Sequence, residues 1–471
     1  MSSSTGPATA LADAASSDDQ ALPRRRLIFF IVSIALFMAS IDQTIVATAL
    51  STIHRELHAG IEWTSWTITI YALGQILAMP LAGKLSDMYG RKRIFVSAVI
   101  LFTIASLLCG LSTNIYMLVA LRAVQAIGGG AFMPSATGIV ADHFGRNRDR
   151  ALGMFTSIFP IGGIIGPVLG GLFVTGWSWR GIFLVNVPIG AILIVLAVVF
   201  LPKGALHPSK KLDVWGVVLL GTLLLSAMFG ITLLGDGSTS PWGVGFLLPE
   251  GIAVAALVLF VLRMKYAESP FIPLRLLRGG GFGVMNLINF LYGAAALGFG
   301  ALVPLYAQDR FGIPVLQAGT LLTARAIGVV CVAGLAVLAL RRTGYRLPMI
   351  VGFVIIAVGL ASMALKPAGV SPYLWLTLSG AIAGIGMGLS VPATNNATMQ
   401  LARDQLAGVA GLRGMFRQSG SIMGVSITTA ILASSNNPGE TLSTVFIVFA
   451  AILVCVVLPV VFLVPEHRGR W

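Results

Sequence analysis

Long apolar segments recur along the whole chain and constrain its fold more than any other feature. From about residue 27 onward, runs of roughly 20 residues alternate with short polar loops, and that length crosses the hydrocarbon core of a bilayer. Only 10% of the residues are charged, against about 25% in a soluble domain. Because lipid cannot satisfy exposed backbone groups and the runs lack the alternation of barrel strands, each run is predicted to be a transmembrane helix.

We predict an all-α integral membrane protein with fourteen transmembrane helices. Residues 1–26 are rich in Ser, Ala and Asp before three arginines, and we expect a disordered N-terminus there. The first apolar run is too long for a signal-peptide core, so we interpret it as a retained helix. The helices are expected near residues 27–50, 63–82, 94–111, 115–138, 150–175, 181–201, 214–235, 244–263, 282–306, 317–340, 347–365, 373–400, 407–434 and 442–464.

The positions of Lys and Arg predict the orientation of these helices. Most basic residues fall in loops on one side, including Arg24–Arg26, Arg91–Arg93 and the stretch 341–346. The opposite side holds few, and cytoplasmic loops are the ones enriched in Lys and Arg. We therefore expect a multi-pass protein of the inner (cytoplasmic) membrane with both termini cytoplasmic, including the tail 466–471, and with lipids as partners.

Composition argues against several other classes of function. The net charge of +14 comes from short loops between apolar runs, so we expect no nucleic-acid partner. The three cysteines lie inside apolar runs and the five histidines lie in loops or the tail, so we expect no metal site. No nucleotide-phosphate loop is present. We expect no enzyme activity and no cofactor, with an ion gradient as the energy source.

Two stretches of the chain resemble each other and indicate an internal repeat. Ala126–Thr137 and Gly384–Asn395 both carry Ile-Gly-x-Gly-x-x-x-Pro, at an offset of 384 − 126 = 258 residues. Repeated helical units are a common construction of transporters. We predict two six-helix units, residues 27–201 and 279–465, separated by a linker, residues 202–278, that contains two inserted helices.

The loop between the second and third predicted helices concentrates charge in a chain that otherwise avoids it. Gly83, Gly90, Arg91 and Arg93 surround Asp87, a lone acid among bases. Asp87 could pair with Arg91 one turn on, or it could cap the positive N-terminus of a helix in the other unit. A loop that serves only as a topology anchor is the alternative.

Asp42 is the one acid deep inside a confidently predicted span. A charge at mid-membrane is costly, and such residues are functional hypotheses with an expected partner. Arg122 in the fourth helix is the obvious partner. A carboxylate that alternates between arginine and a proton could couple transport to a proton gradient. A purely structural ion pair, or an acid that snorkels to the interface, remains open.

Two further groups of residues are candidates for movement and for substrate binding. The fifth helix presents small or kinking residues that suit sliding across the interface of the two units, although ordinary packing would need them too. Polar residues of several helices could line a central cavity, with Met and aromatic side chains as an adaptable wall; each alone could equally be core. The fifth-helix group is Gly162, Gly166, Pro167, Gly170 and Gly171, and the cavity group is Gln75, Gln125, Asn286, Asn289, Tyr292, Asn395 and Arg417.

Several of these stretches together resemble the major facilitator superfamily, and in particular its fourteen-helix drug:proton antiporters. The loop Gly83-x-x-x-Asp87-x-x-Gly90-Arg91-Lys92-Arg93 is similar to the signature loop of that superfamily. The runs Ile41–Leu50, Leu121–Gly130, Gly162–Gly171 and Leu412–Gly424 resemble its helix signatures. The resemblance implies that Asp87 latches the two units together in the outward-facing state. It also implies that the fifth-helix run marks an exporter.

The function expected from the residues and the resemblance together is proton-coupled efflux of amphipathic drugs or toxic organic compounds by alternating access. Small amphipathic molecules and protons would be its partners, and we expect a monomer. The alternatives are an exporter of a lipid or cell-envelope metabolite, an uptake symporter on the same fold, and a membrane enzyme or sensor that moves no solute.

Overall fold

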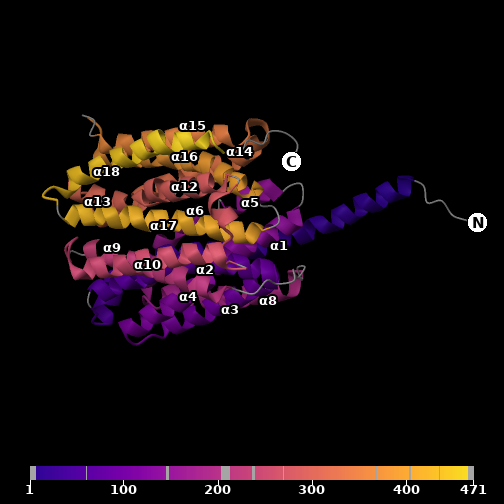
Figure 1. Cartoon of the computed structure of the whole chain (residues 1–471), viewed down its shortest axis with the longest axis horizontal. Helices are drawn as coiled ribbons and strands as arrows, with labels where there is room; N and C mark the ends of the chain where they lie inside the picture. Colours follow the sequence, from indigo (N-terminus) through magenta and orange to yellow (C-terminus); the bar gives the residue numbers. More distant parts are fainter. Residues whose placement is uncertain are drawn as a thin grey trace, which may run out of the picture.

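The structure is a computed structural model of a bundle of long helices (Figure 1). The regular elements that it describes are all helical, in agreement with the expected fold class. Residues 1–6 and the side chains of 7–24 lie outside the described part, as does the tail 466–471, so disorder over 1–26 stays a prediction. The described ranges are 7–59, 61–144, 148–156, 158–202, 213–235, 239–268, 270–279, 281–365, 369–401, 405–433 and 435–464.

The N-terminal half and the two inserted helices form ten of the helical elements. They are α1 (Pro7–Glu56), α2 (Ile61–Tyr89), α3 (Arg91–Gly110), α4 (Ile115–Phe144), α5 (Arg148–Thr156), α6 (Ile158–Gly176), α7 (Gly181–Leu184), α8 (Asn186–Phe200), α9 (Val214–Gly235) and α10 (Val244–Tyr266). The C-terminal half consists of α11 (Leu274–Arg278), α12 (Phe282–Tyr292), η2 (Gly293–Leu297), α13 (Phe299–Phe311), α14 (Val315–Thr343), α15 (Arg346–Ala364), α16 (Pro372–Gln400), α17 (Leu406–Ala433), α18 (Pro438–Ile452), η3 (Leu453–Val457) and α19 (Leu458–Val461).

Eleven segments of the described residues are long and apolar enough to cross a membrane. Three of the predicted spans are helical but fall outside this set. The span 150–175 is divided between α5 and α6, 282–306 contains the π-helical turn η2, and α17 carries two arginines within its length. The total of fourteen membrane crossings therefore stays a prediction.

The internal repeat is visible in the packing of its glycines. A Cβ atom on Gly128 would meet Phe102 of α3, and one on Gly130 would meet Gln75 of α2. In the second copy, Gly386 packs in the same way on α15 and Gly388 on α14. The pair α2 and α3 thus has the same relation to α4 as α14 and α15 have to α16. Equal sequence spacing has produced equal three-helix packing in both halves.

The two halves have largely separate hydrophobic cores. One core joins α1–α6 and α8 to the inserted helices, the first turns of α17 and a few other residues of the C-terminal half: Leu276, Phe282 and Met399. A second core uses only residues from Met285 to Val464. The predicted limits of the units, 27–201 and 279–465, are consistent with these cores but remain a prediction. Figure 1 shows the two halves as separate layers, with α9 and α10 on the side where α2 meets α17.

The inserted hairpin of α9 and α10 is fixed at its base by polar contacts. Asp213, which is buried, accepts from the backbone N–H of Gly216 at 3.0 Å and from the Arg263 guanidinium at 3.0 Å. Lys84 of α2 donates to the carbonyl of Pro270 at 2.8 Å. These bonds close the hairpin and attach its base to the N-terminal half.

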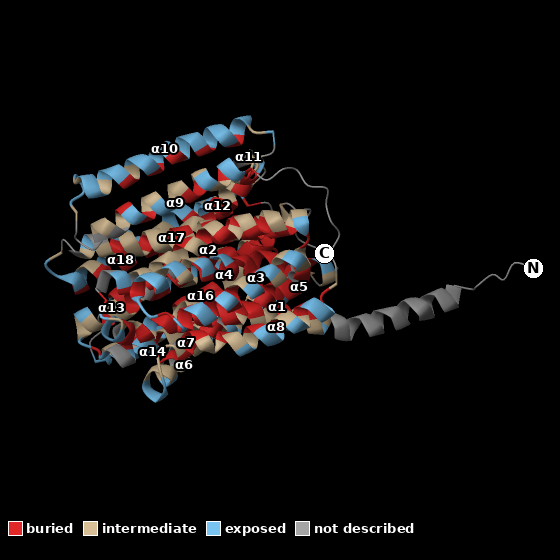
Figure 2. Ribbon diagram, turned by 90° about the horizontal axis from the view of Figure 1, so that it is seen from below, coloured by how far each residue is buried: buried red, intermediate tan, exposed pale blue. Residues whose placement is uncertain are grey.

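The outer surface of the bundle is apolar. Figure 2 shows α10 as a helix that is mostly exposed along its length. Its exposed side chains include Leu248, Val254, Leu257 and Leu262. An exposed apolar surface of this extent on a helix of this length is the surface that lipid covers. The structure therefore supports a membrane-embedded bundle.

Candidate functional site

Asp42 of α1 and Arg122 of α4 form a completely buried ion pair. Arg122 Nη1 lies 2.6 Å from Asp42 Oδ2, and the two side chains are 1% and 0% exposed. The pairing predicted from sequence is confirmed. The alternative that Asp42 snorkels to the interface is wrong, because no part of the carboxylate reaches the surface.

Amides complete the coordination of the Asp42 carboxylate. Gln125 Nε2 donates to Oδ1 at 2.9 Å, and Asn186 Nδ2 donates to the same oxygen at 3.1 Å. Both amides also donate to Ser106 Oγ at 3.1 Å. Gln125, predicted to line the cavity, belongs instead to this network. The carboxylate therefore accepts hydrogen bonds from three side chains, which come from α4 and α8.

Sequence reasoning missed Asn186 and Ser106 as members of this network. Asn186 begins α8 in an otherwise apolar stretch, and Ser106 lies in the apolar α3. A lone amide in a buried apolar helix needs partners, and that was the signal available. Which partners it would find depended on how α3, α4 and α8 pack.

Aromatic rings cover the guanidinium of Arg122. Its Cζ lies 3.9 Å from the centre of the Tyr71 ring and 5.6 Å from that of Phe183. Arg122 Nε also donates to the carbonyl of Thr67 at 3.2 Å. Cation–π contacts are strongest where water is excluded, so these rings hold the arginine beside Asp42.

The charged loop after α2 connects the two halves through Asp87. Its Oδ2 accepts from the backbone N–H of Gly408 at 2.9 Å, in the first turn of α17. A Cβ atom on Gly83 would collide with the carbonyl of Ala407. The predicted cap on a helix of the other unit is therefore present, and Gly83 allows α2 and α17 to approach at the same point. A negative charge at a helix N-terminus is stabilising.

The basic residues of this loop hold its own half together. Arg91 lies 2.5 Å from Asp142 Oδ1 at the end of α4, but 3.8 Å from Asp87 Oδ1, so the predicted Asp87–Arg91 pair is the weaker contact. Gly90 has φ 96°, which favours glycine and permits the turn from α2 into α3. Arg93 is exposed and is not among the described residues that line the central cavity.

The glycines of α6 pack against α1, not against the other half. Cβ atoms on Gly162, Gly166 and Gly170 would meet Ser40, Thr44 and Thr48, respectively. Our prediction that these glycines face the interface of the two units is therefore wrong. Spaced four apart, they form one stripe, and α1 presents small hydroxyl residues at the same spacing. Gly171 has open space around it, and the side chain of Pro167 lies outside the described residues.

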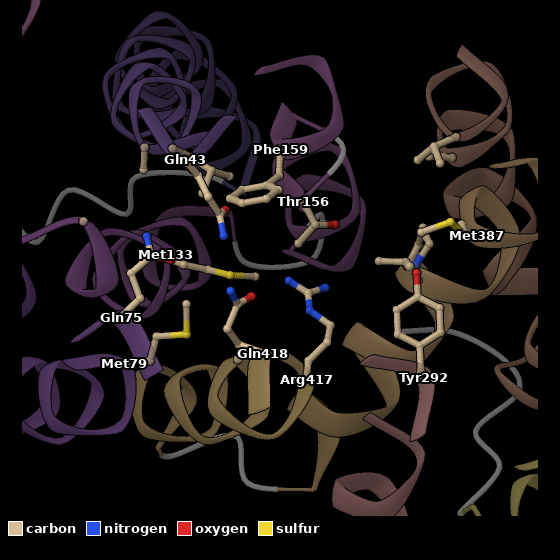
Figure 3. Close-up of a pocket in the computed structure, with 18 of the residues that line it drawn as sticks. Gln43, Gln75, Met79, Met133, Thr156, Phe159, Tyr292, Met387, Arg417 and Gln418 are labelled. Atoms are coloured by element: carbon tan, nitrogen blue, oxygen red, sulfur yellow. The ribbon is translucent and has the colours of Figure 1, made fainter. Parts of the chain in front are cut away.

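A cavity of about 110 Å³ lies between the two halves (Figure 3). Gln75, Tyr292 and Arg417 line it as predicted, and Met79 and Met133 form part of its apolar wall. Gln43, Thr156, Phe159, Met387 and Gln418 also line it and were not among the predicted cavity residues. Since drug-sized sites occupy roughly 300–1,000 Å³, a ligand of that size requires the halves to move apart.

Three predicted cavity residues are part of the helix core instead. Asn286 donates to the carbonyl of Leu276 at 2.9 Å, and Asn289 donates within its own helix to Met285 at 2.7 Å. Asn395 is buried within α16. The alternative interpretation as core residues holds for Asn286 and Asn289. Asn395 Nδ2 is buried without a hydrogen-bond partner among the described residues, and Asn395 is not among the described residues of the cavity lining. Asparagine can satisfy itself on nearby carbonyls, which sequence alone does not distinguish from a cavity role.

Comparisons with known proteins agree on one family. The family model described as the Major Facilitator Superfamily matches residues 32–425 and 285–471. "Multidrug resistance protein 3" of Bacillus subtilis is 31% identical over 403 residues, which cover 84% of this chain and 77% of that protein. "Multidrug resistance protein B homolog" of Mycobacterium tuberculosis is 30% identical over 416 residues, covering 87% and 77%.

Solved structures of transporters share the fold at low sequence identity. The human organic anion transporter MFSD10 (TETRAN) has a TM-score of 0.66 at 16% identity, over 91% of this chain and 99% of that one. The proton:xylose symporter XylE has a TM-score of 0.65 at 13% identity, over 95% and 97%. Family model, relatives and fold agree, and the chain therefore belongs to the major facilitator superfamily of membrane transporters.

Proposed function

We propose that the protein exports amphipathic drugs or toxic organic compounds across the cytoplasmic membrane in exchange for protons, by alternating access. Two relatives at about 30% identity are named multidrug resistance proteins. The observation that carries the proposal is the Asp42–Arg122 pair, which is buried within one moving half.

Alternating access is supported by the position of the contacts between the halves. Asp87 and Gly83 meet the start of α17, and α5 packs on α14 and α16, all beside the loops that carry the basic residues. If those loops are cytoplasmic, this structure is closed toward the cytoplasm. The opposite state requires the Asp87–Gly408 bond to break. The ligand then shifts the population of the two states by its differential affinity for them.

Proton coupling is assigned to Asp42. In the present state Arg122, Gln125 and Asn186 stabilise its charge. A movement of α1 relative to α4 and α8 would remove those donors, and a buried carboxylate without them takes up a proton. Tyr71 and Gln75 both approach Gly129 on the cavity wall, so they connect the cavity to the pair.

Drug susceptibility of a pump-deficient bacterial host tests the proposed function. Expression of the chain should raise the inhibitory concentration of several amphipathic compounds, and Asp42→Asn should abolish the increase at equal membrane expression. Accumulation in energised inverted vesicles, with an uncoupler control, establishes direction. Uptake into intact cells would instead support a symporter, and lipid movement alone would support the envelope-metabolite alternative.

A further inference from the structure

Among the described residues that line the central cavity, Arg417 is the one charged side chain. It projects from α17 toward the middle of the cavity, with Gln418 and Tyr292 on either side (Figure 3). The described part of the lining includes no Asp or Glu. Asp42 lies outside this lining and is neutralised by Arg122. The wall that a substrate meets therefore carries net positive charge.

In the part of the chain that the structure describes, no acid neutralises the guanidinium of Arg417. Arg417 is partly buried, and within the described residues it takes part in no ion pair and no hydrogen bond. The buried Arg122 of the N-terminal half, in contrast, has both. The hydroxyl of Tyr292, whose side chain is 3% exposed, also lacks a hydrogen-bond partner among the described residues. A buried polar group without a partner is costly, so both groups are poised for a ligand.

A second arginine strengthens the positive potential behind the cavity. Arg413 lies one turn before Arg417 on α17 and is 1% exposed. Its Nε and Nη1 have no hydrogen-bond partner in the part of the chain that the structure describes. The two like charges repel each other across one helical turn. A bound anion would relieve that repulsion, whereas a bound cation would add to it.

Close helix packing fixes the position of Arg417. A Cβ atom on Gly293 would collide with the backbone carbonyl of Arg417, and one on Gly420 would collide with that of Phe290. The glycines thus bring α17 against α12 and η2. Arg417 and Tyr292 therefore enter the cavity from two helices in direct contact, which is a preformed arrangement of donors.

We propose that the substrates of this cavity are amphipathic organic anions whose carboxylate, sulfonate or phosphate group binds Arg417. This inference rests on the proposed export function and specifies its substrate class. Tyr292, Gln418 and Gln75 supply further donors at the polar end, and Met79, Met133, Met387 and Phe159 contact the apolar body. Arginine pairs with such groups through two parallel N–H donors.

The charge of the substrate has an energetic consequence for export. A membrane potential that is negative inside drives an anion outward and a proton inward. In the exchange of one anion for one proton, the potential therefore favours both movements. Export of the anion should respond to the electrical potential as well as to the pH gradient.

Binding of two probes with the same apolar body and opposite charge tests the proposal. Pyrenebutanoate is the anion, and a pyrenebutyl-trimethylammonium salt is the cation; both are titrated into the purified full chain. The wild type should bind the anion at least tenfold more tightly. Arg417→Gln should weaken anion binding at least tenfold and leave cation binding equal or tighter, whereas Arg417→Lys should retain most of the preference.

Arg342→Gln is the matched control, because it removes the same charge from an exposed position at the end of α14. It should leave both affinities unchanged. Thermal unfolding of each variant verifies that the fold is intact. Equal binding of the two probes by the wild type, binding of neither, or an anion preference that survives in Arg417→Gln would each overturn the proposal.

Transport in proteoliposomes separates this inference from the export function. If the wild type shows the anion preference but moves neither probe under a combined pH gradient and potential, the exporter proposal fails and the anion site stands. If it moves the cation and shows no anion preference, export stands and the anion site fails.

Discussion

Buried charge occurs in two different settings in this protein. Asp42 and Arg122 neutralise each other inside the N-terminal half, with amide donors on the carboxylate. Arg413 is equally buried, but the described residues offer it no acid. A paired charge is kept for stability or coupling, and an unpaired one is kept for a ligand. The two settings therefore predict different consequences of mutation.

The first prediction concerns the ion pair. Arg122→Gln leaves Asp42 buried without its cation, and the loss should be about 3–5 kcal/mol of stability. The double variant Asp42→Asn/Arg122→Gln has no buried charge, so it should recover most of that loss. Thermal unfolding of the purified variants measures this. Losses that simply add would show that the two residues are not energetically coupled.

The second prediction separates coupling from structure. A purely structural pair would let the double variant, once folded, transport normally. If the pair couples protons to transport, the double variant should equilibrate substrate but should not concentrate it against a gradient. Counterflow and proton-driven accumulation, measured in the same proteoliposomes, distinguish these results. Driven accumulation at the wild-type level would leave the pair with a structural role alone.

The sequence predicted the buried charges of this site better than it predicted the roles of the polar amides. Asp42 and Arg122 were predictable because a charge inside an apolar span has few explanations. Asn286, Asn289 and Gln125 were assigned to the cavity, yet they bond to carbonyls or to Asp42. Amides can satisfy themselves locally or across helices. Which of these occurs depends on how each helix is rotated about its own axis. The sequence does not reveal that rotation, because these helices are apolar on every face.

At the scale of elements, α1 and α6 form a close helix pair that depends on glycine. The stripe of Gly162, Gly166 and Gly170 lies against the hydroxyl residues of α1. Because α1 also carries Asp42, this contact determines how far the carboxylate can move. The glycine stripe of α6, which we predicted to slide at the interface of the two halves, instead packs against α1, the helix that carries Asp42.

The third prediction compares two neighbouring glycines of α6. A Cβ atom on Gly170 would lie 2.8 Å from the carbonyl of Ile45, whereas Gly171 has nothing within 4 Å. Gly170→Ala should therefore destabilise the protein by about 1–3 kcal/mol. Gly171→Ala should be neutral or slightly stabilising, because alanine favours the helix. Equal unfolding temperatures for the two variants would refute the close packing of α6 on α1.

At the scale of the whole molecule, the apolar pattern correctly predicted an all-helical bundle. Ile-Gly-x-Gly-x-x-x-Pro occurs in α4 and α16, which have equivalent neighbours in the two halves. The pattern did not predict which half the inserted helices would join, since their surfaces are apolar throughout. The bond from Lys84 of α2 to the carbonyl of Pro270 makes that attachment, whereas Asp213 and Arg263 close the hairpin itself.

The fourth prediction concerns the contact that closes the bundle. Asp87→Ala removes the acceptor for Gly408 N–H and the charge at the start of α17. A helix-terminal charge contributes about 1 kcal/mol, so the open state should gain roughly fivefold in population. Spin labels at the exposed positions 93 and 342, in a background without Cys109, Cys331 and Cys455, report the distance between the halves.

The distance distribution should shift toward longer separations in Asp87→Ala. As a control, Asp309→Asn removes an exposed acid at the C-terminal end of α13, away from the Asp87 contact. It should leave the distance distribution unchanged. An unshifted distribution in Asp87→Ala would mean that Gly83 and the apolar contacts alone hold the closed state.

The most direct test of the account is the proton flux that accompanies substrate movement. Proteoliposomes with a pH-sensitive dye inside are given a pH gradient, and the dye is followed when substrate is added. The wild type should dissipate the gradient only with substrate, and Asp42→Asn/Arg122→Gln should not, although it still equilibrates substrate. Substrate-dependent proton flux at the wild-type rate in that variant would contradict the assignment of coupling to Asp42.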